Sequence, residues 1–118
     1  MHSIDANGAR IPALGLGTWT LKGEECADLV AHALEVGYRH LDTAVMYANE
    51  EAVGEGLRQS GIQRDNVFVT TKVWWTDIGA NDLRRSAEAS LEKLGLEQVD
   101  LLLIHWPNPA IQLAESIA

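Results

Sequence analysis

The chain has 118 residues, of which 47% are hydrophobic and 22% charged, so it can bury one ordinary core and is neither disordered nor fibrous. Its net charge of −8, without any cluster of Lys or Arg, argues against nucleic acid or an anionic membrane as a partner. The longest strong aliphatic run, residues 101–104, is too short to span a bilayer, and the amino terminus lacks the pattern of a signal peptide. We therefore expect a soluble, cytoplasmic protein.

The first predicted element is a β-hairpin over residues 4–11. It is centred on Asn7-Gly8, a dipeptide that favours the two positive φ angles of a type I′ turn. Four apolar, strand-like runs follow, and helical periodicity fills the gaps between them. These runs are Leu14–Gly17, Tyr38–Thr43, Val67–Val73 and Val99–Trp106. The spacing of their starts is close to the roughly 30 residues of a βαβ unit, so the pattern predicts a parallel α/β sheet.

Three helices are predicted in the gaps, and each is followed by a glycine, which is typical of a left-handed helix end. The first helix carries a buried stripe made of Cys26, Leu29, Val30, Ala33 and Leu34. Cys26 is therefore expected to be a small buried hydrophobe, and as the only cysteine it cannot form a disulfide within the chain.

The second helix is predicted to begin at Asn49 as its N-cap, with Glu50 and Glu51 near its positive end. Its inward residues are Val53, Gly56 and Leu57. The third helix begins near Asn81 or Asp82, and its expected buried residues are Leu83, Ala87, Leu91 and Leu94. A fourth helical pattern starts at Ala110 and runs to the end of the sequence, where no cap, glycine or further strand follows.

Four polar residues stand at or just beyond the carboxyl ends of predicted strands: Asp42, Tyr47, Lys72 and His105. In a parallel sheet these ends meet at one mouth. An ammonium inside an apolar strand such as that of Lys72 needs a partner, and Asp42 on the neighbouring strand is the expected one. The same ammonium would stabilise the phenolate of Tyr47 and make its phenol a better general acid. The alternative is that the Asp-Lys pair and the strand-end His are purely structural.

Several segments of the sequence resemble the aldo-keto reductase family. The main ones are residues 38–44 (Tyr-Arg-His-Leu-Asp-Thr-Ala), 46–50, 53–54, 14–19, 70–74 and 99–107. The resemblance covers essentially the whole chain and looks nearest to bacterial 2,5-diketo-D-gluconate reductases. It implies that residues 1–118 form the N-terminal half of a (β/α)8 TIM barrel preceded by a hairpin, with the C-terminal half absent, and an NADPH-dependent enzyme that reduces carbonyls.

The resemblance also assigns roles to residues. Asp42, Tyr47, Lys72 and His105 would form the catalytic tetrad, with Tyr47 as the general acid and His105 orienting the carbonyl. The cofactor would be contacted by Thr18, Trp19 and Asp42. Independently of the resemblance, four aromatic residues follow strand ends, and with His105 they could line a substrate pocket, with Trp75 or the loop through Ile78 as its rim. The pocket residues are Trp19, Tyr47, Trp74, His105 and Trp106. The alternative is that some of the tryptophans only pack the core or the open edge of the sheet.

Two other patterns carry less chemistry. The run Gly15-Leu16-Gly17 lacks the third glycine of a dinucleotide-binding fingerprint, so it is read as close packing at a strand end. The four histidines and one cysteine show no metal-ligand spacing, and no metal site is predicted.

Half a barrel has two open sheet edges and, we expect, an apolar inner face, which favour association. The chain should therefore self-associate or pair with the missing half. The alternative to an enzyme is a non-enzymatic half-barrel that acts as a homodimer or interaction module. In the family the site for the 2′-phosphate of NADPH lies in the later half, so this chain alone is expected to bind NADPH weakly or not at all.

Overall fold

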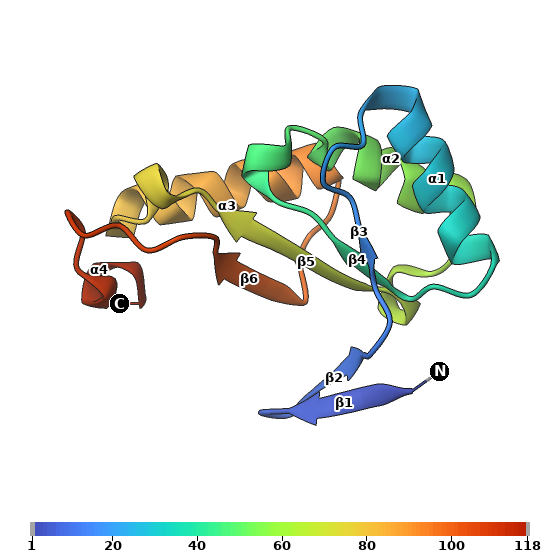
Figure 1. Cartoon of the computed structure of the whole chain (residues 1–118), viewed down its shortest axis with the longest axis horizontal. Helices are drawn as coiled ribbons and strands as arrows, with labels where there is room; N and C mark the ends of the chain where they lie inside the picture. The colour runs from blue at the N-terminus through green and yellow to red at the C-terminus, as the bar shows by residue number, and fades with distance from the viewer. Residues whose placement is uncertain (1, 118) are drawn as a thin grey trace.

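The computed structural model describes residues 2–117, in which a small hairpin precedes a four-stranded sheet covered on one face by helices (Figure 1). The hairpin pairs β1 (Ser3–Ala6) with β2 (Ala9–Pro12) in antiparallel fashion. Asn7 and Gly8 at its tip have φ angles of 48° and 85°. Both are left-handed, as the predicted turn requires, and the predicted hairpin is confirmed.

The sheet consists of β3 (Leu16–Gly17), β4 (His40–Asp42), β5 (Phe68–Val73) and β6 (Leu101–Ile104), hydrogen-bonded in that order. All three pairings are parallel, which confirms the βα alternation. Each strand lies inside its predicted range but is shorter. Some flanking residues still bond the neighbouring strand, since the backbone N–H of Thr43 donates to Thr70 and that of His105 donates to Val73. The backbone N–H of Tyr38 instead donates to Ala33 near the end of the preceding helix.

The predicted helices are confirmed as α1 (Gly23–Glu35), α2 (Glu50–Ser60) and α3 (Ala80–Leu94), and a short α4 spans Leu113–Ile117. Single turns of 3₁₀ helix follow three strands or helices, at η1 (Val45–Tyr47), η2 (Arg64–Asn66) and η3 (Trp75–Asp77). Gly61 and Gly95 end α2 and α3 in the left-handed conformation, as predicted. Over residues 2–117, no helix has both the length and the apolar character needed to cross a membrane.

The core lies between the sheet and the helices. Its buried members are Cys26, Val30, Leu34, Leu41, Val53, Leu57, Val67, Val69 and Leu94. Leu29 was predicted to belong to the buried stripe of α1, and this is wrong: Leu29 is 39% exposed, and Ala27 is buried instead. The stripe turns toward Ala27 because α1 packs closely on α2. A Cβ added to Gly56 would stand 2.5 Å from the carbonyl oxygen of Ala27, so only glycine permits this approach.

The face of the sheet away from the helices is polar along β4 and β5. Alternation along the strands places the polar side chains of His40, Asp42, Thr70 and Lys72 on it, together with the apolar ring of Phe68. The predicted apolar inner face is therefore wrong for these two strands. Their polar groups are paired, since the His40 Nε2 lies 2.9 Å from the Thr70 hydroxyl and its Nδ1 lies 3.3 Å from the Pro12 carbonyl oxygen.

The edge strand β6 differs from its neighbours. Leu102 and Leu103, which point to opposite faces, are 37% and 38% exposed. Trp106 just beyond the strand is also exposed, as are Leu113 and Ile117 of α4. This side of the sheet therefore keeps a group of large apolar side chains exposed.

Candidate active site

The four predicted catalytic residues come from three neighbouring strands. Asp42 is the last residue of β4, Tyr47 closes the 3₁₀ turn that follows, and Lys72 is the penultimate residue of β5. His105 comes directly after β6. Because these strands are parallel, their carboxyl ends share one edge of the sheet, and the structure brings the four side chains together there.

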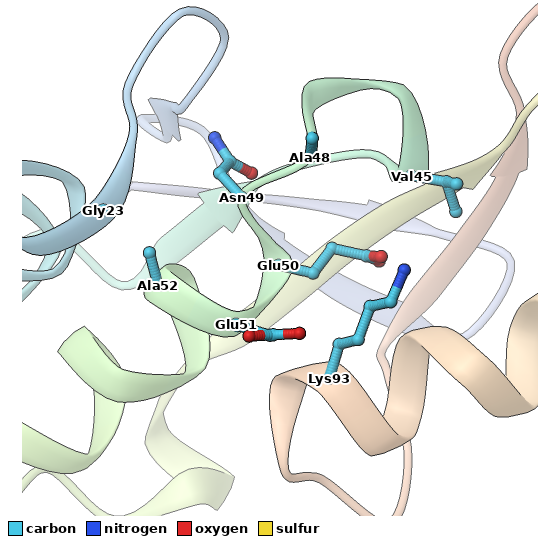
Figure 2. A pocket seen from close by; sticks show the side chains of 8 residues that line it. All are labelled: Gly23, Val45, Ala48, Asn49, Glu50, Glu51, Ala52 and Lys93. Carbon is cyan, nitrogen blue, oxygen red and sulfur yellow. The ribbon is translucent and has the colours of Figure 1, made fainter.

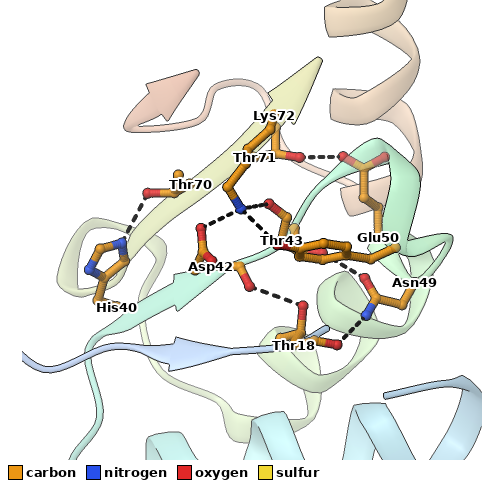
Figure 3. A network of polar contacts seen from close by, with 10 residues as sticks. Thr18, His40, Asp42, Thr43, Asn49, Glu50, Thr70, Thr71 and Lys72 are labelled. Atoms are coloured by element: carbon orange, nitrogen blue, oxygen red, sulfur yellow. Dashed lines mark hydrogen bonds and ion pairs between the residues drawn. The ribbon is translucent and has the colours of Figure 1, made fainter. Parts of the chain in front are cut away.

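Lys72 is the centre of the group (Figure 3). Its Nζ donates to Asp42 Oδ1 at 2.8 Å, to the Thr43 carbonyl oxygen at 3.0 Å and to the Tyr47 hydroxyl oxygen at 3.2 Å. These bonds use all three donors of the ammonium, and the expected pairing with Asp42 is confirmed. An ammonium can only donate, so the Tyr47 oxygen accepts and its own proton is free to go to another acceptor.

The His105 ring meets the Tyr47 ring edge to face, with centroids 5.7 Å apart. Burial and, to a smaller extent, the Lys72 ammonium lower the pKa of His105, while the Asp42 carboxylate partly opposes this. The imidazole is therefore neutral near pH 7 and has one N–H to donate. Its Nδ1 is buried and has no hydrogen-bond partner among residues 2–117.

Two tryptophans flank the imidazole. The centroids of Trp74 and His105 lie 5.4 Å apart, and those of Trp74 and Trp106 lie 4.9 Å apart. These rings form an aromatic wall beside the tetrad, and its role as the wall of a carbonyl pocket stays a prediction. Trp19 is 66% exposed and stands outside this group of contacting rings in the part of the chain that the structure describes, so its pocket role stays a prediction.

The loop after β5 was predicted to form a rim through Ile78, and for Ile78 this is wrong. Its side chain is only 1% exposed and belongs to the core. The loop is held from the segment after β6: the Asn108 side-chain amide donates to the Trp75 carbonyl oxygen at 2.9 Å, and the Ser116 hydroxyl donates to that of Ile78. Trp75 keeps a partly exposed place at the edge of the wall.

The predicted cofactor residues divide into two kinds. Asp42 is partly exposed, and its carboxylate retains acceptor capacity beyond the bond from Lys72, while the exposed ring of Trp19 offers a stacking face. These two fit the polar and aromatic groups at the nicotinamide end of a dinucleotide. Thr18 is fully buried, and its hydroxyl donates to the Asp42 carbonyl oxygen at 3.0 Å. Its contribution to such a site would act through Asp42.

Two residues at the start of α2 make hydrogen bonds that the sequence did not predict. Asn49 occupies the N-cap position as predicted, but its side chain makes no capping bond. Instead it bonds Thr43, Thr18 and Leu21. Glu50 was assigned only to the helix dipole, yet it is buried and accepts a hydrogen bond from Thr71. The available signal was the adjacent pair Asn49-Glu50, which begins two residues after the candidate acid Tyr47.

A hollow of about 300 Å³ lies at the start of α2 rather than at the tetrad (Figure 2). Its lining consists of Gly23, Val45, Ala48, Asn49, Glu50, Glu51, Ala52 and Lys93. Lys93 of α3 extends toward the Glu50 carboxylate from across the hollow. None of the four tetrad residues lines this space. We place the candidate active site at the tetrad because its chemistry, and not the depth of a depression, identifies it.

The fold and the tetrad together define the class. The chain belongs to the aldo/keto reductase family, whose sequence model matches residues 13–118. It is 53% identical over 103 residues to the 9,11-endoperoxide prostaglandin H2 reductase of Trypanosoma cruzi, an alignment that covers 86% of this chain and 36% of the relative.

Two solved structures superpose closely. One, named for 2,5-diketo-D-gluconic acid reductase B, has 47% identity and a TM-score of 0.95 over 99% of this chain and 42% of that one. The other is an aldo-keto reductase complexed with NADPH, with 34% identity and a TM-score of 0.91 over 98% of this chain and 42% of that one. The predicted fold and the likeness to diketo-gluconate reductases are confirmed. The chain spans only about a third of the length of its curated relatives.

Proposed function

We propose that this chain supplies the proton-donating part of an NADPH-dependent reductase that converts aldehyde or ketone carbonyls to alcohols. The observation that carries the proposal is the triple bonding of Lys72, whose ammonium joins the Asp42 carboxylate to the Tyr47 phenol. Membership of the family and the superposed NADPH complex support the choice of chemistry and cofactor. The roles of the individual residues are part of the proposal.

Bound NADPH would supply the hydride that reaches the carbonyl carbon. Tyr47 would give its phenolic proton to the carbonyl oxygen, so that an alcohol and a phenolate result, and solvent would later return a proton to the phenolate. The Lys72 ammonium would stabilise that phenolate, and the Asp42 carboxylate holds the ammonium in place. Neutral His105 would donate its N–H to the carbonyl and fix its direction. A general acid of this kind contributes about 10²- to 10⁴-fold in rate.

NADPH would be held at its nicotinamide end by Trp19 and Asp42, with Thr18 fixing Asp42 from behind. The family resemblance places the grip on the 2′-phosphate in a later part of the barrel, so we expect weak binding by these 118 residues alone. The relatives are named for different substrates: a diketo acid and methylglyoxal are carbonyl compounds, whereas an endoperoxide is not. We therefore propose only a class of substrate, a small carbonyl compound, and no particular member of it.

The test is the Tyr47→Phe variant, assayed by oxidation of NADPH in the presence of a reactive aromatic aldehyde. We expect a loss of about 10²-fold or more, because phenylalanine keeps the ring contacts and lacks the proton. Tyr38→Phe is the matched control and should keep wild-type turnover, since Tyr38 lies at the opposite end of β4. Equal turnover by wild type and Tyr47→Phe would contradict the acid assignment. A wild-type chain without turnover would contradict enzymatic action by this chain alone.

A second candidate is self-association through the β6 side of the sheet, favoured by the exposure of Leu102, Leu103 and Trp106. We expect a dimer or larger species by light scattering after size exclusion. Leu103→Lys should shift it toward the monomer, because a charge on an edge strand opposes pairing. Val36→Lys, at an exposed apolar residue after α1, is the control and should change nothing. A monomeric wild-type chain would eliminate this candidate.

A further inference from the structure

We propose that Asn49 and Glu50 are positioning residues that hold the Tyr47 turn between β3 and β5 and thereby set the separation of the Tyr47 phenol from the Lys72 ammonium. The catalytic consequence rests on the proposed function. The holding itself rests on contacts that do not depend on that function. Asn49 is the N-cap of α2 and Glu50 is the first residue of the helix, so capping and interaction with the helix dipole would be their ordinary roles.

All hydrogen bonds of the Asn49 side chain go to residues outside its own helix. It is 3% exposed. Its Oδ1 accepts from the Thr43 hydroxyl at 2.6 Å, and its Nδ2 donates to the carbonyl oxygens of Thr18 at 2.8 Å and Leu21 at 3.0 Å. Both amide hydrogens and the oxygen are therefore used, and Figure 3 shows the bonds with Thr18 and Thr43. Asn49 joins the loop after β3 to the loop after β4, which carries Tyr47.

Both loops contain a strained residue beside these bonds. Thr20 has a φ of 73° and lies between the two carbonyls that Asn49 binds, and Ala48, with a φ of 54°, directly precedes Asn49. Left-handed residues other than glycine are strained and persist only where the surroundings fix them. The Asn49 amide is placed to fix both. The Lys22 ammonium adds a bond from the first loop to the Tyr47 carbonyl oxygen.

Glu50 links the Tyr47 turn to β5, on the side opposite β3. It is 3% exposed, and its Oε2 accepts from the Thr71 hydroxyl at 2.7 Å. Thr71 immediately precedes Lys72 in β5 and points to the helix side, so this bond ties the start of α2 to the strand that presents the ammonium. Asn49 also acts near Lys72, because the Thr43 residue that it binds offers its carbonyl oxygen to Nζ. Asn49 and Glu50 thus fix the position of the Tyr47 phenol relative to the Lys72 ammonium from two sides of the turn.

The decisive variant is Asn49→Ser, because serine is a good N-cap but cannot reach the Thr18 and Leu21 carbonyls. If Asn49 served only as a cap, this variant would behave as wild type. If it positions Tyr47, amide hydrogen exchange should speed up in residues 18–22 and 44–48, while amides in the middle of α2 stay protected. Unchanged exchange in those two loops would overturn the proposal.

The second measurement separates positioning from folding. We expect kcat for carbonyl reduction by Asn49→Ser to fall about tenfold to a hundredfold with little change in the KM for the carbonyl, because a displacement near 1 Å has effects of that size. Glu50→Gln should stay near wild type, since its amide oxygen still accepts from Thr71, whereas Glu50→Ala should lose turnover. Glu51→Ala removes a neighbouring exposed charge at the same helix end and should change neither readout.

A second variant tests the same hydrogen bonds if the first one does not fold. Should Asn49→Ser fail to fold, Thr43→Val removes one bond of the same set while keeping the side-chain shape, and the loop amides should again exchange faster. Wild-type turnover by Asn49→Ser with faster loop exchange would overturn the positioning role. A wild-type chain without carbonyl reduction would instead contradict the proposed function, and the exchange experiment would still decide whether Asn49 holds the turn.

Discussion

The two central strands of the sheet, β4 and β5, differ from the edge strand β6 in how their polar and apolar side chains are buried. Along β4 and β5, apolar side chains lie under the helices, and the polar ones on the other face are paired, as with His40 and Thr70 or Asp42 and Lys72. Along β6, apolar side chains remain exposed on both faces. Three of the four tetrad residues belong to the well-packed region, whereas His105 depends on the less covered one.

The largest expected difference between the regions is in packing. Leu41→Ala in β4 should lower the free energy of unfolding by about 2 to 5 kcal/mol, because Leu41 is fully buried and a cavity would remain. Leu102→Ala in β6 should cost less than about 1 kcal/mol, since Leu102 is already partly in water. Urea unfolding of the two variants checks this. Equal losses would show that β6 is covered in solution, for example by a second copy.

The contact that joins the regions should come next in size. The Asp100 carboxylate, before β6, accepts from Arg64 at 2.7 Å and from the Val69 backbone N–H at 2.8 Å. Asp100→Ala should cost about 1 to 3 kcal/mol, because it leaves the Val69 N–H without its acceptor. Asp82→Ala, which removes an exposed pair with Arg85 at 2.8 Å, should cost less than about 0.5 kcal/mol. Similar unfolding midpoints for the two variants would contradict this view of the junction.

The smallest expected effect is the pH dependence that His105 adds at the edge. Its folded-state pKa is lowered below the ordinary value of about 6.5, so the unfolded chain binds more protons in the window between the two values. This contribution to stability is complete above that window and is lost as the pH falls through it. His105→Gln should remove it, which urea titrations near neutral and mildly acid pH would detect. His32→Gln, at an exposed site of α1, is the control. A His105→Gln variant with the pH dependence of wild type would show that the imidazole is not buried.

Local patterns were enough for most of the fold and for the tetrad. The Asn7-Gly8 turn and the alternation of strands and helices depend on neighbours in the sequence, and the structure confirms them. Parallel strand ends must share an edge, so residues at those ends could be grouped before any coordinates. The errors have two origins. Leu29 and the inner face of the sheet were assigned from hydrophobicity, but the packing of α1 on α2 and the alternation along β4 and β5 decide which side each residue faces. Ile78 was placed at a rim because its loop follows a strand end, but its side chain is buried in the core.

The sequence by itself determined the order of elements, the hairpin and the identity of the residues that could carry a proton to a carbonyl. Only the tertiary structure decided what surrounds them. It gave Lys72 three acceptors from β4 and the following turn, and it turned the Asn49 and Glu50 side chains away from capping toward Thr18, Leu21, Thr43 and Thr71. The physical reason is that nearly all of these partners lie 20 or more residues away along the chain, so their pairing follows from how the strands and helices pack and not from local periodicity.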